Sequence, residues 1–251
     1  TVLELPNGLA TGVRTASDFL MALQLTGAAK ANSVANMQLR LPVVVVGGGS
    51  VVCGGGSVVG GGVVVAGGAV VGEGAVVGAG AMGSVYAGLL AAAGHDVTAI
   101  DTWADHVAAI RERGLRVEGA SGDRTVSVKA TCDAADVGPV DLVILATKAH
   151  DVQAAARAAM PLVGPDTVVL PIQNGLGSAD RVASILGEDR VAIGVVGGFG
   201  ASVVAPGHVR HEGWELVRLG ERHAPASERI ETIADVWREA GFRVQTYDDT
   251  D

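Results

Sequence analysis

Apolar and polar residues alternate along residues 74–251 in blocks that predict strands and helices in turn. The predicted strands are the short apolar runs Gly74–Val77, Asp96–Asp101, Leu142–Ala146 and Val168–Ile172. Helix-like patterns occur at Ser84–Ala93, at Trp103–Arg113 and from about Asp151, and Leu115–Val128 predicts a hairpin around Gly119–Asp123. This alternation predicts an α/β fold with a doubly wound, Rossmann-type parallel sheet.

The chain before residue 74 has a different pattern and divides into two parts. Residues 1–42 predict a loop followed by a helix, with Ser17 as a candidate N-cap. Residues 43–73 consist almost wholly of Val, Gly, Ala and Ser and open on the β-branched run Val43–Val46. We therefore expect an N-terminal helical and loop fragment (1–42), a Gly/Val low-complexity linker (43–73) and a dinucleotide-binding domain (74–251).

The low-complexity segment repeats with a period of six residues from Val45, as VVGGGS, VVCGGG and SVVGGG. A transmembrane helix is favoured by the absence of charge between Arg40 and Glu73, but each glycine costs about 1 kcal/mol of helix propensity. A left-handed parallel β-helix is favoured by a resemblance to the hexapeptide repeat of acyltransferases, yet nothing downstream continues the period. We favour a linker, because a slip of six residues restores the pattern and leaves the register undefined.

The composition excludes several classes of protein. With 251 residues, of which 49% are hydrophobic and 18% charged, the chain can bury a sizeable core and is not disordered by composition. Its net charge of −9 argues against nucleic acid as a partner, because phosphates bind clustered Lys and Arg. Cys53 and Cys132 cannot form a disulfide framework, and the histidines are scattered, so no metal site is expected. No secretory signal is evident, and we expect a cytoplasmic protein that does not bind membranes.

A glycine-rich turn after the first of these strands carries the strongest chemical signal. The segment Gly78–Gly83 fits the pattern GxGxxG and precedes a helix, a second strand and Asp101. The first glycine permits the tight bend, Gly80 lets a pyrophosphate approach the backbone, and Gly83 lets the helix pack closely. Amides at the helix start would bind the phosphates. A carboxylate at Asp101 would accept the ribose hydroxyls and repel a 2′-phosphate, which favours NAD over NADP.

Polar residues also follow the later predicted strands. Lys148 comes after Leu142–Ala146, and Asn174 comes after Val168–Ile172. The carboxyl ends of strands in such sheets face the crevice that binds ligands. Lys148 is therefore a candidate to neutralise cofactor phosphate, and Asn174 is a candidate to hydrogen-bond a carboxamide or a substrate hydroxyl.

The sequence from residue 74 to the C-terminus resembles the ketopantoate reductase (2-dehydropantoate 2-reductase) family. The resemblance rests on Gly78–Gly83, Asp101, Leu145–Ala149 and Pro171–Gly177. That family couples a nucleotide-binding domain to a C-terminal helical domain and reduces a 2-oxo acid with NADPH. The resemblance implies that the pyrophosphate is held by Gly78, Ala79, Gly80, Ala81, Met82 and Gly83. It also implies that Lys148 lies near the cofactor, that Asn174 contacts cofactor and substrate, and that Gly200 makes a backbone contact.

Two features depart from the family pattern. Members selective for NADPH usually carry a basic residue where Asp101 stands, so NAD and NADP are both candidate cofactors. No residue matches the family's catalytic lysine, which lies on the first long helix of the helical domain, whereas this sequence ends at Asp251. We therefore assign no catalytic residue and expect cofactor binding with little or no turnover. An apolar patch left where the helical domain normally packs would promote self-association.

Residues 1–49 have a different likeness. From Gly12 to Gly49 they resemble a pyridine-nucleotide segment of flavoprotein oxidoreductases related to the glutamate synthase small subunit, with the repeat in place of the expected helix. We interpret the chain as a composite of two pieces joined by low-complexity sequence. The leading hypothesis is NAD(P)H-dependent reduction of 2-dehydropantoate or a related 2-oxo acid. The alternatives are a flavin-linked pyridine nucleotide oxidoreductase, a non-catalytic nucleotide-binding fragment and a hexapeptide-repeat acyltransferase.

Overall fold

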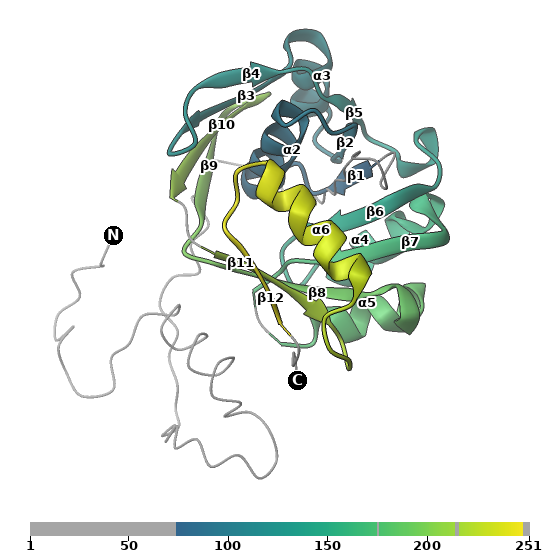
Figure 1. Cartoon of the computed structure of the whole chain (residues 1–251). Helices are drawn as coiled ribbons and strands as arrows, with labels where there is room; N and C mark the ends of the chain where they lie inside the picture. The colour runs from purple at the N-terminus through teal and green to yellow at the C-terminus, as the bar shows by residue number, and fades with distance from the viewer. Residues whose placement is uncertain (1–73, 175, 214–215, 248–251) are drawn as a thin grey trace, which may run out of the picture. The chain divides into compact units, whose positions relative to one another are not determined.

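The computed structural model describes residues 74–174, 176–213 and 216–247, in which strands and helices alternate (Figure 1). The strands are β1 (Gly74–Val77), β2 (Val97–Ile100), β3 (Leu115–Gly119), β4 (Arg124–Val126), β5 (Lys129–Thr131), β6 (Val140–Leu145), β7 (Val163–Pro171), β8 (Ala192–Gly197), β9 (Gly200–Ala205), β10 (His208–Gly213), β11 (Leu216–Glu221) and β12 (Val244–Tyr247). The α-helices are α2 (Ala81–Ala92), α3 (Ala104–Arg113), α4 (Val152–Ala158), α5 (Ser178–Leu186) and α6 (Glu228–Glu239). Short 3₁₀ helices are η1 (Ala134–Asp136), η2 (Met160–Leu162) and η3 (Glu188–Arg190).

A largely parallel sheet forms the centre of this domain. β6 lies between β1 and β7 and runs parallel to both. β2 pairs in parallel with β5, and the Gly78 N–H donates to the Ile100 carbonyl at 3.0 Å, which joins the ends of β1 and β2. A parallel bridge between Val169 and Val191 leads from β7 toward β8, which pairs with β11 in the antiparallel sense. The order β5-β2-β1-β6-β7-β8 is that of a doubly wound sheet, so the predicted fold class is confirmed.

Helix α2 is covered on two sides, which explains why its sequence is apolar almost all round. One side packs on the parallel sheet, and a second sheet of order β4-β3-β10-β9 covers the other side (Figure 1). Gly88 permits this contact, because a Cβ there would lie only 2.6 Å from Cγ2 of Val117 on β3. The predicted β3–β4 hairpin is confirmed, whereas the parallel pairing of β10 with β3 was not predicted.

Aromatic rings join α2 to α6 on one face of the parallel sheet. The ring centroid of Tyr86 lies 5.1 Å from that of Trp237, and Phe242 lies 4.8 Å from Trp237, both in edge-on geometry. Such pairs stabilise a core beyond the burial of their area. Trp237 is fully buried, and burial raises the pKa of the Tyr86 phenol above its ordinary value. Helices α4 and α5 lie on the other side of the sheet from α6 in Figure 1, so both faces are covered.

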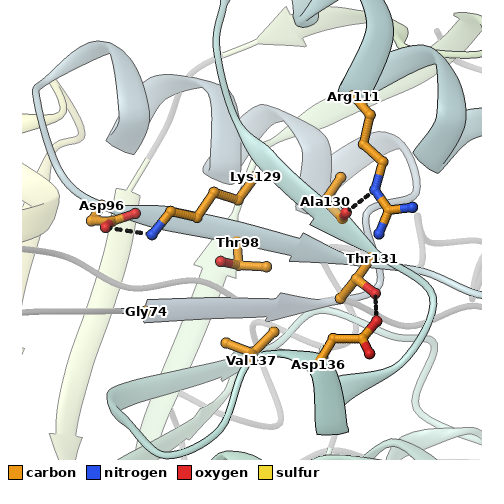
Figure 2. A pocket seen from close by; sticks show the side chains of 9 residues that line it. All are labelled: Gly74, Asp96, Thr98, Arg111, Lys129, Ala130, Thr131, Asp136 and Val137. Atoms are coloured by element: carbon orange, nitrogen blue, oxygen red, sulfur yellow. Dashed lines mark hydrogen bonds and ion pairs between the residues drawn. The ribbon is translucent and has the colours of Figure 1, made fainter.

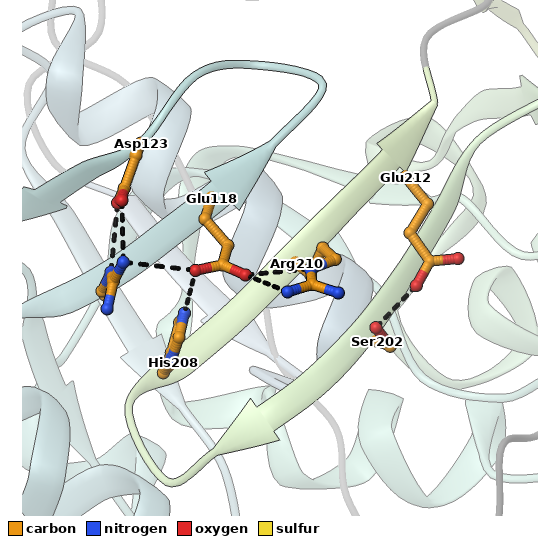
Figure 3. Close-up of polar contacts among 7 residues, drawn as sticks. Glu118, Asp123, Ser202, His208, Arg210 and Glu212 are labelled. Carbon is orange, nitrogen blue, oxygen red and sulfur yellow. Dashed lines mark hydrogen bonds and ion pairs between the residues drawn. The ribbon is translucent and has the colours of Figure 1, made fainter.

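The outer face of the second sheet carries charged side chains that pair across its strands (Figure 3). Glu118 on β3 accepts hydrogen bonds from Arg210 at 2.6 Å and from His208 at 2.9 Å, both on β10. The hydrogen bond from Arg210, and to a lesser extent that from His208, holds the pKa of Glu118 below its ordinary value. Arg116 pairs with Asp123 at 2.7 Å. Exposed ion pairs contribute little stability each. We therefore expect these pairs to fix the register of β3 against β10 and to keep this face of the sheet hydrated.

Several sequence-based expectations lie outside the described residues. They are the helix within residues 1–42, the linker and its two competing interpretations within residues 43–73, and the flavoprotein likeness of residues 1–49. The proposed boundaries between these parts stay predictions. Among the described residues, no helix has the length and apolar character that crossing a bilayer requires.

We predict that Gly119→Ala destabilises the protein more than Gly138→Ala does. Both glycines have positive φ, +102° and +82°, so alanine is strained by about 1–2 kcal/mol at either position. At Gly119 a Cβ would also lie 2.2 Å from the His211 carbonyl oxygen, whereas nothing lies within 4 Å of a Cβ at Gly138. Urea denaturation should show a loss of about 1 kcal/mol for Gly138→Ala and at least about 3 kcal/mol for Gly119→Ala. Equal losses would contradict the close packing of β3 on β10.

Candidate functional site

The turn between β1 and α2 is shaped by the close approach of helix and strand. β1 ends at Val77, Gly78 takes a φ of +120°, and α2 begins at Ala81 with Gly80 as its N-cap. A Cβ on Gly83 would lie 1.9 Å from the carbonyl oxygen of Gly78. Only glycine fits at that position, so the first turn of α2 rests directly on the end of β1.

The backbone amides at the start of α2 are available to a ligand. Within the part of the chain that the structure describes, no side chain caps them. Gly80, Ala81 and Met82 are partly exposed, and a Cβ on Gly80 would have no neighbour nearer than 3.9 Å. Free N–H groups at a helix start, at the positive end of the helix dipole, bind anions. The turn therefore has the geometry that a phosphate site requires.

Asp101 lies beside this turn, at the carboxyl end of β2. The hydrogen bond from Gly78 to Ile100 brings the two strand ends together, and the Asp101 N–H donates to the Thr131 carbonyl at 3.1 Å. The Asp101 side chain is 4% exposed, and its Oδ1 accepts the Trp103 N–H at 2.9 Å. Burial raises the pKa of this carboxyl to about 6, against the opposing effect of the hydrogen bonds from the Trp103 and Thr102 backbone. The carboxyl group is thus fixed at the carboxyl end of β2, beside the turn between β1 and α2.

The other predicted site residues follow the carboxyl ends of neighbouring strands. Lys148 follows β6 and Asn174 follows β7, and both side chains are exposed. Because β6 runs parallel to β1 and β7, these residues share the edge that carries the glycine turn. Gln173 joins the two strand ends, since its Nε2 donates to the Leu145 carbonyl at 2.7 Å. Gly200 begins β9 in the second sheet, shortly after the carboxyl end of β8. Their roles toward a ligand stay predictions.

A buried polar pair beneath the turn was not predicted from the sequence. Ser84 Oγ lies 2.6 Å from the Ala79 carbonyl oxygen and 3.1 Å from Nε2 of His106. Both side chains are fully buried, and the Trp103 ring stacks on His106 with centroids 5.0 Å apart. The available signals were a hydroxyl directly after the glycine motif and a histidine on the buried side of the next helix. Neither signal specifies that the two residues meet.

Figure 2 shows a cavity, of about 250 Å³, whose lining includes none of the residues of the glycine turn. The residues that line it are Gly74, Asp96, Thr98, Arg111, Lys129, Ala130, Thr131, Asp136 and Val137. Gly74 and Asp96 stand at the amino ends of β1 and β2, whereas ligands of doubly wound sheets bind at the carboxyl ends. Its charged groups are occupied, because Lys129 donates to Asp96 at 2.6 Å and Arg111 donates to the Ala130 carbonyl. We therefore place the candidate site at the turn and not in this cavity.

We predict that ionisation of Asp101 makes the protein less stable as the pH rises. Because folding raises the pKa of this carboxyl from 3.8 to about 6, the folded state holds the proton more tightly than the unfolded chain does. The protonated carboxyl contributes fully to the free energy of unfolding below pH 3.8. This contribution is lost as the pH rises through about 6, which lowers the free energy of unfolding by about 3 kcal/mol. Urea denaturation should show this decline in the parent protein and not in Asp101→Asn. Parallel pH profiles for the two proteins would contradict the assigned burial.

Sequence comparisons place the described domain among known proteins. A family model described as ketopantoate reductase PanE/ApbA matches residues 75–224. The 2-dehydropantoate 2-reductase of Pyrococcus abyssi is 39% identical over 159 residues, which cover 63% of this chain and 51% of that protein. The 2-dehydropantoate 2-reductase of Halobacterium salinarum is 32% identical over 162 residues, which cover 64% of this chain and 53% of that protein. The chain spans about half the length of these curated relatives.

Solved structures share the fold. The crystal structure of 2-dehydropantoate 2-reductase from Geobacter metallireducens matches with a TM-score of 0.64 at 35% identity, covering 68% of this chain and 56% of that chain. The ternary structure of D-mandelate dehydrogenase with NADH and anilino(oxo)acetate matches with a TM-score of 0.61 at 29% identity, covering 68% of this chain and 55% of that chain. The family resemblance predicted from the glycine motif and the strand ends is therefore confirmed. With residues 75–224 matching the family model and the fold shared with a solved 2-dehydropantoate 2-reductase, the chain belongs to the ketopantoate reductase PanE/ApbA family.

Proposed function

We propose that the described domain binds a nicotinamide dinucleotide along the carboxyl edge of its parallel sheet. One observation carries this proposal: the 3.0 Å hydrogen bond from Gly78 to Ile100 sets Asp101 against the glycine turn. The uncapped amides of α2 would donate to the diphosphate, and the Asp101 carboxylate would accept the hydroxyls of the adenosine ribose. The fit depends on Gly83, where any side chain would push α2 away from the turn.

Residues after β6 and β7 would orient the rest of the ligand. The bound nicotinamide would supply a hydride. Lys148 would neutralise charge on the cofactor phosphates, and Asn174 would hydrogen-bond the carboxamide or the substrate. Gly200 would offer a backbone contact. This assignment is supported by their position after the carboxyl ends of β6, β7 and β8, the edge at which such sheets bind ligands.

We further propose that the substrate is a 2-oxo acid, 2-dehydropantoate or a related compound. The names of the curated relatives support this choice, as does the presence of NADH and anilino(oxo)acetate in the D-mandelate dehydrogenase structure. Reduction of a ketone needs a proton donor as charge develops on the oxygen. The lysines of the described residues are Lys129, which pairs with Asp96 away from the edge, and Lys148, which we assign to the phosphates. We propose that the described domain binds and orients the cofactor and by itself supports little turnover. The low cysteine content favours a cytoplasmic setting.

We predict that the chain prefers NADH and that Asp101→Arg shifts this preference toward NADPH. A buried carboxylate repels a 2′-phosphate, whereas a guanidinium binds it. Fluorescence titration should show the ratio of NADPH to NADH affinity rising by at least about tenfold, and Asp101→Ser should change it in the same direction by less. Asp166→Arg, which makes the same charge change at an exposed position near the amino end of β7, is the control and should leave the ratio unchanged. An unchanged ratio in Asp101→Arg would contradict the role of this carboxylate.

We predict that the 251-residue chain binds NADH but oxidises it slowly or not at all with 2-dehydropantoate. The physical reason is the lack of a proton donor of the family's kind among the residues at the sheet edge. Binding is measured by quenching of intrinsic Trp fluorescence, and turnover is measured by the loss of NADH absorbance. Sustained oxidation that depends on 2-dehydropantoate would contradict catalytic incompleteness. Failure to bind NADH would contradict the proposed function itself.

We also propose a flavin-linked activity and self-association. A flavin-linked activity rests on residues 1–49, which lie outside the described part, and a yellow purified protein would favour it. Self-association is supported by exposed apolar side chains near the carboxyl edge, of which Leu176 is 60% exposed and Trp103 is 36% exposed.

A further inference from the structure

A continuous hydrogen-bonded chain runs beneath the glycine turn and ends in the second sheet. Ser84 Oγ on α2 bonds to the Ala79 carbonyl oxygen at 2.6 Å and to Nε2 of His106 on α3 at 3.1 Å. The other ring nitrogen of His106, Nδ1, accepts the Gly207 N–H at 3.1 Å from the turn between β9 and β10. Ser84 and His106 are fully buried, so water does not compete for these bonds.

The direction of every hydrogen bond in this series follows from the two backbone groups at its ends. The Gly207 N–H can only donate, so Nδ1 of His106 carries no proton. Burial lowers the pKa of His106 to about 4, and the neutral ring therefore carries its proton on Nε2. Nε2–H then donates to Ser84 Oγ, which leaves the serine proton for the Ala79 carbonyl, a group that can only accept. His106 thus fixes the direction in which the Ser84 hydroxyl points.

The peptide bond between Ala79 and Gly80 converts this buried contact into an orientation at the surface. In a trans peptide the carbonyl and the next N–H point in opposite directions. Ser84 holds the Ala79 carbonyl toward the protein interior, since Ala79 is fully buried. The Gly80 N–H must then point outward, at the partly exposed start of α2. Gly80 has no Cβ to resist rotation of this peptide, so an external anchor has a clear physical role.

We propose that Ser84 and His106 are positioning residues that aim the Gly80 amide at the diphosphate of the dinucleotide. This inference rests on the proposed function, since it names how the turn is made ready for that ligand. The effect is geometric and not a matter of net charge, because the neutral imidazole places no cation beneath the turn. The second sheet contributes through Gly207, and its packing on α2 supports the cofactor site as well as the fold.

The test compares ligands with and without a diphosphate on the 251-residue chain. In Ser84→Ala, affinity for ADP-ribose should fall by about tenfold, the effect of one lost hydrogen-bond anchor, while affinity for adenosine should stay within about twofold. Isothermal titration calorimetry measures both ligands on the same preparation. Thr167→Val is the matched control, because Thr167 in the middle of β7 is also buried and its hydroxyl donates to the Val140 carbonyl at the amino end of β6. It should lower the melting temperature and leave both affinities unchanged.

Variants that keep some of these hydrogen bonds distinguish the contributions of Ser84 and His106. Ser84→Thr retains the hydroxyl and should recover most of the ADP-ribose affinity. His106→Gln keeps a donor for Ser84, whereas His106→Asn keeps an acceptor for the Gly207 N–H and loses that donor, so His106→Asn should weaken ADP-ribose binding more. This comparison also holds if Ser84→Ala does not fold.

The possible results separate the two levels of the proposal. Equal losses for ADP-ribose and adenosine, or no loss for either, would overturn the positioning role and leave the proposed function in place. A parent protein that binds neither ADP-ribose nor NADH would overturn both.

Discussion

The contact between Gly83 and the Gly78 carbonyl determines where α2 sits, and the rest of the domain is arranged around that helix. Because a Cβ on Gly83 would come within 1.9 Å of that oxygen, the helix starts directly on the end of β1. The same helix then meets the second sheet at Gly88, where a Cβ would lie 2.6 Å from Val117. A helix that close to two sheets has little room for long polar side chains, and its sequence is small and apolar apart from Ser84 and Tyr86. The glycine motif is therefore a packing constraint first, and its free amides are a consequence of that packing.

The parts of this arrangement that follow from local pattern could be predicted from the sequence. β1, α2 and β2 were located because an apolar run, a glycine motif and a terminal acid occur in order within one short segment. β7 was predicted to begin at Val168, but it begins at Val163, because Gly164, Pro165 and Asp166 interrupt the apolar pattern ahead of its buried half. The pairing of β3 with β10 and the contact of Ser84 with His106 could not be predicted. Each joins segments whose separation along the chain leaves no periodic trace.

Two helix starts act at the same edge of the sheet. The first turn of α2 offers amides that no described side chain caps, while Asp101 accepts the backbone N–H of Trp103 just before α3 begins. That hydrogen bond lowers the pKa of Asp101 only in part against burial, so the carboxyl reaches about 6. A buried carboxylate is stabilised further by a ligand that donates hydroxyl groups to it. The ribose of a dinucleotide brings two vicinal hydroxyls, which is the physical reason for the proposed role of Asp101 at this strand end.

Both halves of the proposed adenosine diphosphate site are thus held in place without the ligand. The Ala79 carbonyl is held by Ser84, and the Asp101 carboxylate is held by the backbone that opens α3. His106 connects the two, since it bonds to Ser84 and stacks on Trp103. A site ordered in advance loses less conformational entropy on binding, so more of the interaction energy appears as affinity. The contacts that hold this proposed site, from the Ala79 carbonyl to the Gly207 N–H, all lie between β1 and β10, so the preorganisation is built within the described domain.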